Sequence, residues 1–495
     1  MKEVVTTSLI KQCKTLNHLA QIHAQITTQT LNLTNPLLLP TLLQSFTSLI
    51  PNPPPQTPLR QRLLSYANSL FHQIHGPATF SYNNLTRACT LLSAQSQALR
   101  IFTRMRLLGL PPDSHTFPFV LSASARIGSA CLVPALHCQA FKFGFLIDLF
   151  VVNNLVHAYA AGAEAVWDAW KVFDESPQRD AVSYNAMIDG FVKSGDLVRA
   201  REVFDGMPER ESVSWGTMLA GYAASDQCAE AIRLFNRMLG EDGVSPDNVA
   251  LVAVMSACAR LGEVEQGKLV HDYIIRTRIQ VDVYLCTALV DLYAKCGDIE
   301  MSIKIFESCY DRNLFTWNSM LVGLAMHGHC QTCLDYFSRM VESGIRPDGV
   351  SFLAVLVACS HSGLVEDARQ LFRDMELVFN VPKEHKHYGC MADLLARAGL
   401  IEEANEMIDG MQEGGNLFAW GGLLGGCRTH QNITIAEKAA KNVVTLYPED
   451  GGVYAIMVNV YANAERWDEV EGVRRLMRAK RVKRNAGRSV IHMSG

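Results

Sequence analysis

A short sequence motif that recurs four times along the chain limits the folds that the chain can adopt. Each copy places an aromatic residue before a polar or small one: Tyr82 in FSYNNL, Tyr184 in VSYNAM, Trp215 in VSWGTM and Trp317 in FTWNSM. The four aromatic residues are separated by 102, 31 and 102 residues. Self-similarity at a fixed period is the signature of a repeat architecture. We therefore expect this chain of 495 residues to form an extended array rather than one compact domain.

A second phrase follows the same 102-residue period. DGFVKSGDLV begins at Asp189, DLYAKCGDIE at Asp291 and DLLARAGLIEEA at Asp393. The period divides into unequal parts of about 35, 35 and 31 residues, and each part has room for two helices joined by a turn. The repeating unit is therefore predicted to be a helical hairpin.

The hairpin can be followed in residues 182–210. Apolar side chains recur at helical spacing in both halves, at Tyr184, Met187, Ile188 and Phe191 and then at Leu197, Ala200, Val203, Phe204 and Met207. Gly195 is suited to end the first helix, Asp196 to cap the second, and Pro208 to stop it. One hairpin cannot bury its apolar faces alone, so successive hairpins must stack. The predicted fold class is all-α, an α-solenoid of helix-turn-helix repeats in which these aromatic and Met side chains are mainly core.

These units resemble pentatricopeptide repeats. The resemblance is carried by VSYNAMIDGFVKSGDLVRAREVFDGMPER, FTWNSMLVGLAMHGHCQTCLDYFSRMVESGIRPD and LVDLYAKCGDIEMSIKIFES. The alternating part lengths are similar to those of the plant PLS subfamily, in which P, long (L) and short (S) motifs alternate. The resemblance implies a right-handed superhelix, with the array in residues 79–416. Weaker copies precede it in residues 1–78, where PNPPPQTP at 51–58 predicts an extended loop.

The C-terminal part resembles an extension found in the same family. EHKHYGCMADLLARAGLIEEANEMIDGM is similar to the last short motif, and the segment from FAWGGLLGGC to MRAKRVKR is similar to the E-type extension, which is built of TPR-like hairpins. This assigns the extension to residues 417–484 and a tail to residues 485–495. In the family such extensions occur in organelle RNA-editing factors. Larger members continue into a DYW deaminase domain, which is not expected here.

The resemblance implies that each repeat faces one base of a single-stranded RNA. The base would be read by the fifth residue of the first helix and the last residue of the repeat, because Asn, Thr and Asp side chains can hydrogen-bond a base edge. The pairs that match a uridine pattern are Asn83 with Asp113, Asn153 with Asp180, and Asn318 with Asp348. Thr287 with Asn313 matches an adenine pattern. Asn185 with Glu211 and Gly216 with Asp247 match no standard pair, so their bases stay open.

Two further sets of residues belong to this prediction. The long motifs carry Pro118, Val252 and Leu353 at the fifth place, and these side chains cannot hydrogen-bond a base, so the long motifs are expected to space the array. The second residues resemble an apolar clamp that sandwiches bases: Phe80, Val182, Val213 and Phe315. The alternative for the clamp residues is hairpin core. The alternative for the fifth-place Asn residues is a helix cap or a solvent-facing amide.

Charge gives little support to a general affinity for nucleic acid. The formal net charge is −4 and the pI about 6.4, so a polyanion site would have to be a local basic groove. One basic run is present: Arg474, Arg475, Arg478, Lys480, Arg481, Lys483, Arg484 and Arg488. It is open to two interpretations, a solvated helix face or a contact with RNA or an acidic partner.

No catalytic residue, cofactor or metal site is predicted. A cytidine deaminase needs a His-x-Glu motif beside its zinc cysteines, and no His here is followed two residues later by Glu. The sole C-x-x-C, Cys330 to Cys333 beside His327 and His329, falls at a hairpin turn and is interpreted as repeat structure. Fourteen cysteines without regular pairing predict reduced, buried thiols rather than disulfides. No apolar run reaches 18 residues, so no transmembrane helix or membrane association is expected.

Two functions from different classes follow. The first is a sequence-specific RNA-binding adaptor that selects a cytidine for C-to-U editing and recruits a deaminase-bearing or other editing protein through residues 417–484; an RNA stability or splicing role is its variant. The second is a TPR-like protein-binding scaffold. The polar pairs favour the first, because a peptide groove has no reason to omit them from the long motifs. From Met1 to Pro112 one acidic residue, Glu3, stands against nine Lys or Arg, which predicts a mitochondrial or chloroplast destination, with the mitochondrion slightly preferred.

Overall fold

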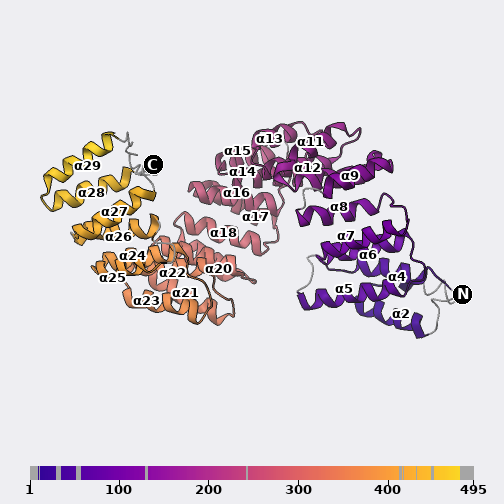
Figure 1. The fold of residues 1–495 in the computed structure, drawn as a ribbon, viewed down its shortest axis with the longest axis horizontal. Helices are drawn as coiled ribbons and strands as arrows, with labels where there is room; N and C mark the ends of the chain where they lie inside the picture. The colour runs from indigo at the N-terminus through magenta and orange to yellow at the C-terminus, as the bar shows by residue number, and fades with distance from the viewer. Residues whose placement is uncertain are drawn as a thin grey trace. The chain divides into compact units, whose positions relative to one another are not determined.

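The computed structural model describes residues 9–10, 12–28, 35–51, 57–128, 132–240, 243–411, 415, 417–430, 432–446 and 451–479. Within these residues the chain forms 27 α-helices, two short 3₁₀ helices and no strand. The predicted all-α class is confirmed. The chain divides into two compact units, Met1–Val254 and Met255–Gly495, and helix α16 (Asn248–Leu261) contains the boundary (Figure 1).

The first unit begins with three helices and continues as a series of hairpins. The early helices are α2 (Leu16–Thr28), α4 (Leu38–Ser48) and α5 (Thr57–His72). The hairpins are formed by α6 (Thr79–Leu91) and α7 (Gln95–Leu107), α8 (Thr116–Ile127) and α9 (Leu132–Lys142), α10 (Leu149–Ala160) and α11 (Val166–Glu175), α12 (Ala181–Lys193) and α13 (Leu197–Asp205), and α14 (Ser212–Ala224) and α15 (Cys228–Gly240). The 3₁₀ helices η1 (Phe145–Ile147) and η2 (Ala163–Ala165) lie in two of the connections. Most of the Pro-rich stretch predicted to be a loop lies outside the described residues, and α5 begins at Thr57.

The second unit repeats the hairpin arrangement. Its helices are α17 (Val264–Thr277), α18 (Val283–Lys295), α19 (Ile299–Ser308), α20 (Leu314–Met326), α21 (Cys330–Glu342), α22 (Gly349–Ser362), α23 (Val365–Leu377), α24 (His385–Arg397), α25 (Ile401–Asp409), α26 (Leu417–His430), α27 (Ile433–Leu446), α28 (Gly451–Asn463) and α29 (Trp467–Ala479). In each unit the first helices of consecutive hairpins pack against one another, as α10, α12 and α14 do, and the second helices form a separate layer (Figure 1). Among the helices described, none combines the length and the apolar composition needed to cross a membrane.

The recurring aromatic residue binds each hairpin to the one before it. The ring of Trp215 meets Phe204 edge to face at a centroid distance of 4.9 Å, and Trp317 meets Phe306 in the same way at 4.8 Å. Tyr82 packs on Phe71 at 4.9 Å. Such pairs add about 0.5–1.5 kcal/mol beyond the burial of area. Tyr82, Trp215 and Trp317 are therefore core, as predicted, whereas Tyr184 is partly buried.

The predicted turn inside the hairpin is also confirmed. Helix α12 ends at Lys193, and Gly195 follows with a φ of +82°. Glycine adopts this left-handed conformation with little steric strain because it has no Cβ atom. The carboxylate of Asp196 then accepts a hydrogen bond from the backbone N–H of Arg199 at 3.1 Å and caps α13. Residues 194–196 thus end one helix and begin the next.

One expectation about the cysteines is wrong. Cys286 on α18 and Cys309, at the end of α19, form a disulfide with their Cα atoms 6.6 Å apart. The two helices of the hairpin run antiparallel, so residues 23 apart in sequence face each other. Spacing alone does not reveal that approach. Other thiols are buried as expected, including Cys89, Cys228 and Cys359.

Candidate nucleic-acid interface

The structure brings three of the predicted reading pairs together. The amide Nδ2 of Asn83 donates to Asp113 Oδ1 at 2.8 Å. Asn153 donates to Asp180 Oδ1 at 3.0 Å, and Asn318 to Asp348 Oδ1 at 3.0 Å. Each Asn lies one turn into a first helix, and each Asp stands at the start of the next first helix. The helical period and the stacking of hairpins together place the two side chains side by side.

Each Asp is held by the helix that follows it. Asp180 accepts from the N–H of Ser183 at 2.9 Å, and Asp348 accepts from the N–H of Ser351 at 3.0 Å, so both cap a helix. Burial pushes the pKa of Asp180 up, but the Ser183 backbone and hydroxyl and the Asn153 amide outweigh it, and the pKa is lowered overall. The pKa of Asp348 is lowered by the same kinds of contact, again against burial. Both carboxyls are therefore ionised at neutral pH.

A hydroxyl that the sequence analysis missed completes each of these groups. It stands three residues after the Asp, in the first turn of the following first helix, and it donates to the Asn Oδ1: Thr116 to Asn83 at 2.8 Å, Ser183 to Asn153 at 2.6 Å, and Ser351 to Asn318 at 2.6 Å. The Asn side chains are almost fully buried, Asn153 at 7% exposure. The alternative of a solvent-facing amide is thereby excluded for these three. The available signal was the Ser or Thr that stands three residues after each Asp.

The predicted adenine pair is joined through a neighbour. The hydroxyl of Thr287 donates to the Val283 carbonyl at 2.7 Å and lies 2.7 Å from the hydroxyl of Thr316. Thr316 also lies 3.1 Å from Asn313 Oδ1, and Asn313 caps α20. Thr287 and Asn313 thus meet at Thr316, three residues after Asn313, as the Asn and Asp pairs meet at the residue three after the Asp.

The two pairs without a standard match lack this arrangement. Glu211 precedes α14 and gives it no side-chain cap. Within the described part of the chain, the Oδ1 of Asn185 and the hydroxyl of Ser214 are buried without a hydrogen-bond partner. At Gly216 a Cβ atom would lie 3.2 Å from Asp247 Oδ1, so the glycine leaves no side chain to pair with that carboxylate.

The residues predicted to clamp bases stand on the surface. Val182 is 59% exposed and Phe315 is 68% exposed, and Phe80 and Val213 are exposed as well. The alternative that they belong to the hairpin core does not hold. The same second place is occupied by two exposed aromatic residues that the sequence analysis overlooked, Phe150 and Tyr284. They were missed because their helices lack the repeated aromatic phrase.

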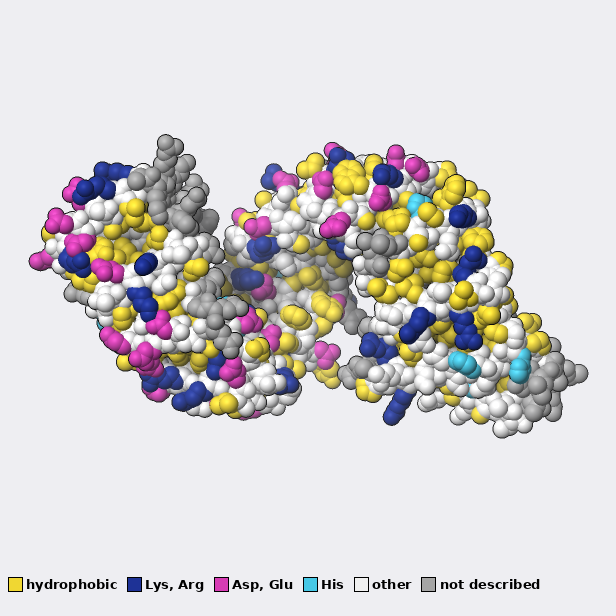
Figure 2. Space-filling model, viewed as in Figure 1, with side chains coloured by type: hydrophobic (Ala, Val, Ile, Leu, Met, Phe, Trp, Pro, Cys, Tyr) yellow, Lys and Arg dark blue, Asp and Glu magenta, His cyan; other side chains and the backbone are white. Residues whose placement is uncertain are grey.

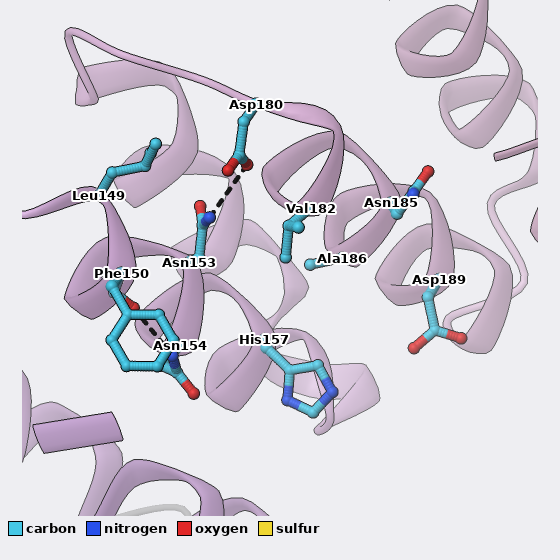
Figure 3. A pocket seen from close by; sticks show the side chains of 10 residues that line it. All are labelled: Leu149, Phe150, Asn153, Asn154, His157, Asp180, Val182, Asn185, Ala186 and Asp189. Carbon is cyan, nitrogen blue, oxygen red and sulfur yellow. Dashed lines mark hydrogen bonds between the residues drawn. The ribbon is translucent and has the colours of Figure 1, made fainter. Parts of the chain in front are cut away.

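A cavity of about 590 Å³ lies between α10 and α12 at one of these sites. Its lining includes the pair Asn153 and Asp180, the apolar side chains of Phe150 and Val182, and His157 one turn further along α10 (Figure 3). Burial holds the pKa of His157 below its usual value, and Lys193 lowers it further. The cavity is therefore apolar on two sides and has a polar, hydrogen-bonding wall, which suits a flat heterocyclic ring.

The cysteines of the C-x-x-C motif lie in the hairpin core. Cys330 and Cys333 are buried at the start of α21, and the Cys333 thiol lies 3.5 Å from the Leu321 carbonyl oxygen, to which it donates. Burial, with the neighbouring thiols Cys330 and Cys359, raises the pKa of Cys333 to about 12. Across the described residues no group of three His, Cys, Asp or Glu side chains is placed to hold a metal ion.

Basic side chains are unevenly distributed. Residues 9–112 contain no Asp or Glu, and on the face drawn in Figure 2 the N-terminal part of the chain, up to α7, presents basic side chains and His without acidic neighbours. In the C-terminal basic run, Arg474, Arg475 and Arg478 are exposed on α29. The other members of that run, Lys480, Arg481, Lys483, Arg484 and Arg488, lie outside the described residues.

Comparison with known proteins places the chain in a family. Six segments match the PPR repeat, at residues 182–212, 213–242, 284–314, 315–345, 350–377 and 386–416, and residues 430–492 match the E motif. The fold resembles the crystal structure of the maize pentatricopeptide repeat protein PPR10 in complex with an 18-nt psaJ RNA element, with a TM-score of 0.56 at 16% identity over 97% of this chain and 79% of that one. One pentatricopeptide repeat-containing protein of Arabidopsis thaliana is 39% identical over 435 residues, 87% of this chain and 82% of its own. Another is 54% identical over 491 residues, which is 98% of both chains. With more than half of its residues shared along nearly its whole length, this chain belongs to the pentatricopeptide repeat family, as an E-type member.

Proposed function

We propose that this protein binds single-stranded RNA in a sequence-specific way and selects a site for C-to-U editing in an organelle. The observation that carries the proposal is the threefold recurrence of one hydrogen-bonded group, Asn with Asp, beside an exposed apolar residue. The fold is shared with PPR10, whose crystal structure contains an RNA element, and this supports RNA as the ligand. The array would present one such group to each base, in single-stranded RNA whose base edges are free.

The chemistry of the group suits uracil. Asn153 uses one amide hydrogen on Asp180 and keeps the other, and Asp180 keeps lone pairs on its second oxygen. An N–H donor beside a carboxylate acceptor complements a base edge that offers a carbonyl oxygen next to an N–H. Uracil has that edge, whereas cytosine has an unprotonated ring nitrogen there, which the carboxylate would repel. Phe150 and Val182 would pack on the two faces of the ring.

Binding to short RNAs tests this proposal. The repeats predict the base order U-x-U…A-U-x, with bases opposite Asn83, Asn153, Thr287 and Asn318. Changing one of these bases should weaken binding by roughly 2–10-fold, the value of one hydrogen bond. Asn318→Thr and Thr287→Asn should each change the preferred base only at their own position. Absence of binding at low salt, or binding that ignores base identity, would mean that the proposal is wrong.

The editing role is supported by the E motif at residues 430–492, which overlaps the segment 417–484 that we propose binds a deaminase-bearing or other editing protein in trans. The acid-poor sequence to Pro112 supports a mitochondrial or chloroplast site of action, with the mitochondrion slightly preferred. Comparison of organelle C-to-U sites in the presence and absence of the protein is the direct test. We expect at least one cytidine whose editing depends on the protein, lying beside the predicted base order. If RNA abundance or splicing changes while every editing site is retained, the protein acts as a stability or splicing factor instead.

A TPR-like scaffold that binds protein alone is the second candidate, favoured by the net charge of −4. It predicts that partner binding is unaffected when the reading pairs are changed, and that RNA does not compete with the partner.

A further inference from the structure

The reading groups contain a third member that belongs to the next repeat. In all three, the residue three after the Asp, in the first turn of the following first helix, donates its hydroxyl to the Asn Oδ1, at 2.6–2.8 Å. The same hydroxyl oxygen accepts the backbone N–H of the Asp, at 3.0 Å from Thr116, 3.1 Å from Ser183 and 3.2 Å from Ser351. All three hydroxyl residues are buried.

These contacts determine which way the Asn amide points. An ionised carboxylate can only accept hydrogen bonds, so the Asn153 nitrogen must face Asp180. Its oxygen then faces Ser183, whose hydroxyl has one hydrogen to give and lies nearer to Asn153 Oδ1, at 2.6 Å, than to Asp180 Oδ1, at 2.9 Å. Turning the amide over would place its oxygen against the carboxylate. Carboxylate and hydroxyl therefore hold the amide from both ends.

We propose that Thr116, Ser183 and Ser351 are positioning residues that hold the reading amide in one orientation, so that each Asn–Asp site is built by two consecutive repeats. The proposal rests on the function proposed above, since the orientation of the amide matters when its free N–H and lone pair meet a base. Without the hydroxyl, the amide would lose the contact that fixes its oxygen. The site would then accept bases that offer a donor where uracil offers a carbonyl.

The site formed by Asn185 and Glu211 has the hydroxyl but not the aspartate. Ser214 occupies the same place in α14, one repeat after Ser183, and is equally buried. Here Glu211 stands where the other sites have Asp, and among the described residues neither the Ser214 hydroxyl nor Asn185 Oδ1 has a hydrogen-bond partner. A hydroxyl at this place therefore does not by itself orient the amide. It does so where an Asp holds the nitrogen.

Matched substitutions test the proposal in the full-length protein. Ser183→Ala should reduce discrimination among the four bases opposite Asn153 by roughly 2–10-fold, the value of one hydrogen bond, while discrimination opposite Asn318 stays unchanged. Ser183→Thr, which keeps the hydroxyl, should restore it. Ser214→Ala should change base preference nowhere. The readout is binding to RNA sets that differ only at the base in question, with circular dichroism to check that helix content is retained.

The outcomes are distinct. If Ser183→Ala keeps full discrimination opposite Asn153, or if discrimination falls equally at every position, the positioning role is overturned. If Ser183→Ala fails to fold, Ser351→Ala carries the same test in the other unit, read opposite Asn318. If the unaltered protein binds no RNA, the proposed function itself fails, and the inference fails with it. If Ser183→Ala binds RNA with the same base preference as the unaltered protein, only the positioning role fails.

Discussion

At the scale of single residues, the aspartate of each reading pair has two roles. Asp180 bonds the Asn153 amide of its own repeat and caps α12 of the next. In the proposed function, stability and base recognition therefore share one side chain. The two roles can be separated by comparison with an Asp that caps a helix without bonding an Asn of a reading pair, and Asp196 at the start of α13, which also pairs with Arg199, is such a residue.

Asp180→Ala and Asp196→Ala should destabilise their helices to a similar degree. Loss of an N-cap costs about 1 kcal/mol, which corresponds to roughly fivefold faster amide hydrogen exchange in α12 or α13 respectively. Base preference opposite Asn153 should change in Asp180→Ala alone. An equal change of preference in Asp196→Ala would show that general loosening of the repeat, and not the carboxylate, governs recognition.

His387 makes the stability of the last repeat depend on pH. It is buried at the third place of α24, accepts the Glu384 N–H at Nδ1 (2.9 Å) and donates from Nε2 to the Gly349 carbonyl (2.7 Å), so it is neutral. Burial lowers its pKa from the ordinary 6.5, outweighing the Gly349 carbonyl and Glu384, which raise it. Between the lowered folded pKa and 6.5 the unfolded chain binds a proton that the folded chain does not, so stability is complete above pH 6.5 and declines as the pH falls below it.

The variant His387→Ser keeps a capping residue at that place and removes the titration. The difference in thermal unfolding midpoint between the original protein and His387→Ser should be constant above pH 6.5 and should move in favour of the variant below it. Parallel curves down to pH 5 would contradict the buried neutral imidazole.

At the scale of elements, contact between consecutive first helices depends on one small residue. A Cβ atom on Gly190 in α12 would lie 2.7 Å from the Cβ of Ala160 in α10, an atom fixed to its backbone. Gly221 in α14 is similarly close to Val192, so the requirement recurs one repeat later. These glycines let the first helices approach and thereby set the separation of neighbouring reading groups.

Gly190→Ala should destabilise the α10–α12 contact. Overpacking costs about 1–3 kcal/mol, which exceeds the gain of about 0.5–1 kcal/mol from replacing a helical glycine. Gly472→Ala is the matched control, because nothing lies within 4 Å of its added Cβ in α29, and it should be stabilising. Hydrogen exchange of α10 and α12, together with the thermal midpoint, gives the comparison. A stabilising Gly190→Ala would mean that the two helices can move apart without cost.

At the scale of the whole molecule, the net charge of −4 provides no general attraction for RNA. Phosphate contacts must then come from a few local cations. Arg87 is a candidate: it stands one turn after Asn83 on α6 and so shares its face, and its guanidinium lies over the Phe119 ring of α8 at 5.9 Å.

Arg87→Gln should weaken binding to every RNA alike, without changing base preference. Each phosphate contact contributes about 0.7 to the slope of log affinity against log salt for single strands, so the slope should become shallower by about that amount. Arg104→Gln on the second helix α7 is the control and should leave both affinity and slope unchanged. An altered base preference in Arg87→Gln would show that Arg87 contacts a base instead.

The sequence by itself determined the helical hairpins, and its resemblance to a known family pointed to the Asn and Asp residues that the structure brings together. The 3.6-residue spacing of apolar side chains and the local signals at Gly195 and Asp196 act within a few residues, so they can be read in order along the chain. The resemblance to pentatricopeptide repeats then implied the pairs Asn153 with Asp180 and Asn318 with Asp348. Only the tertiary structure decided which groups meet between helices: Ser183 with Asn153 and Phe150 beside Val182 across hairpins, and Cys286 with Cys309 within one. The physical reason is that these contacts depend on the rotation and separation of packed helices, which side-chain packing sets and no local pattern records.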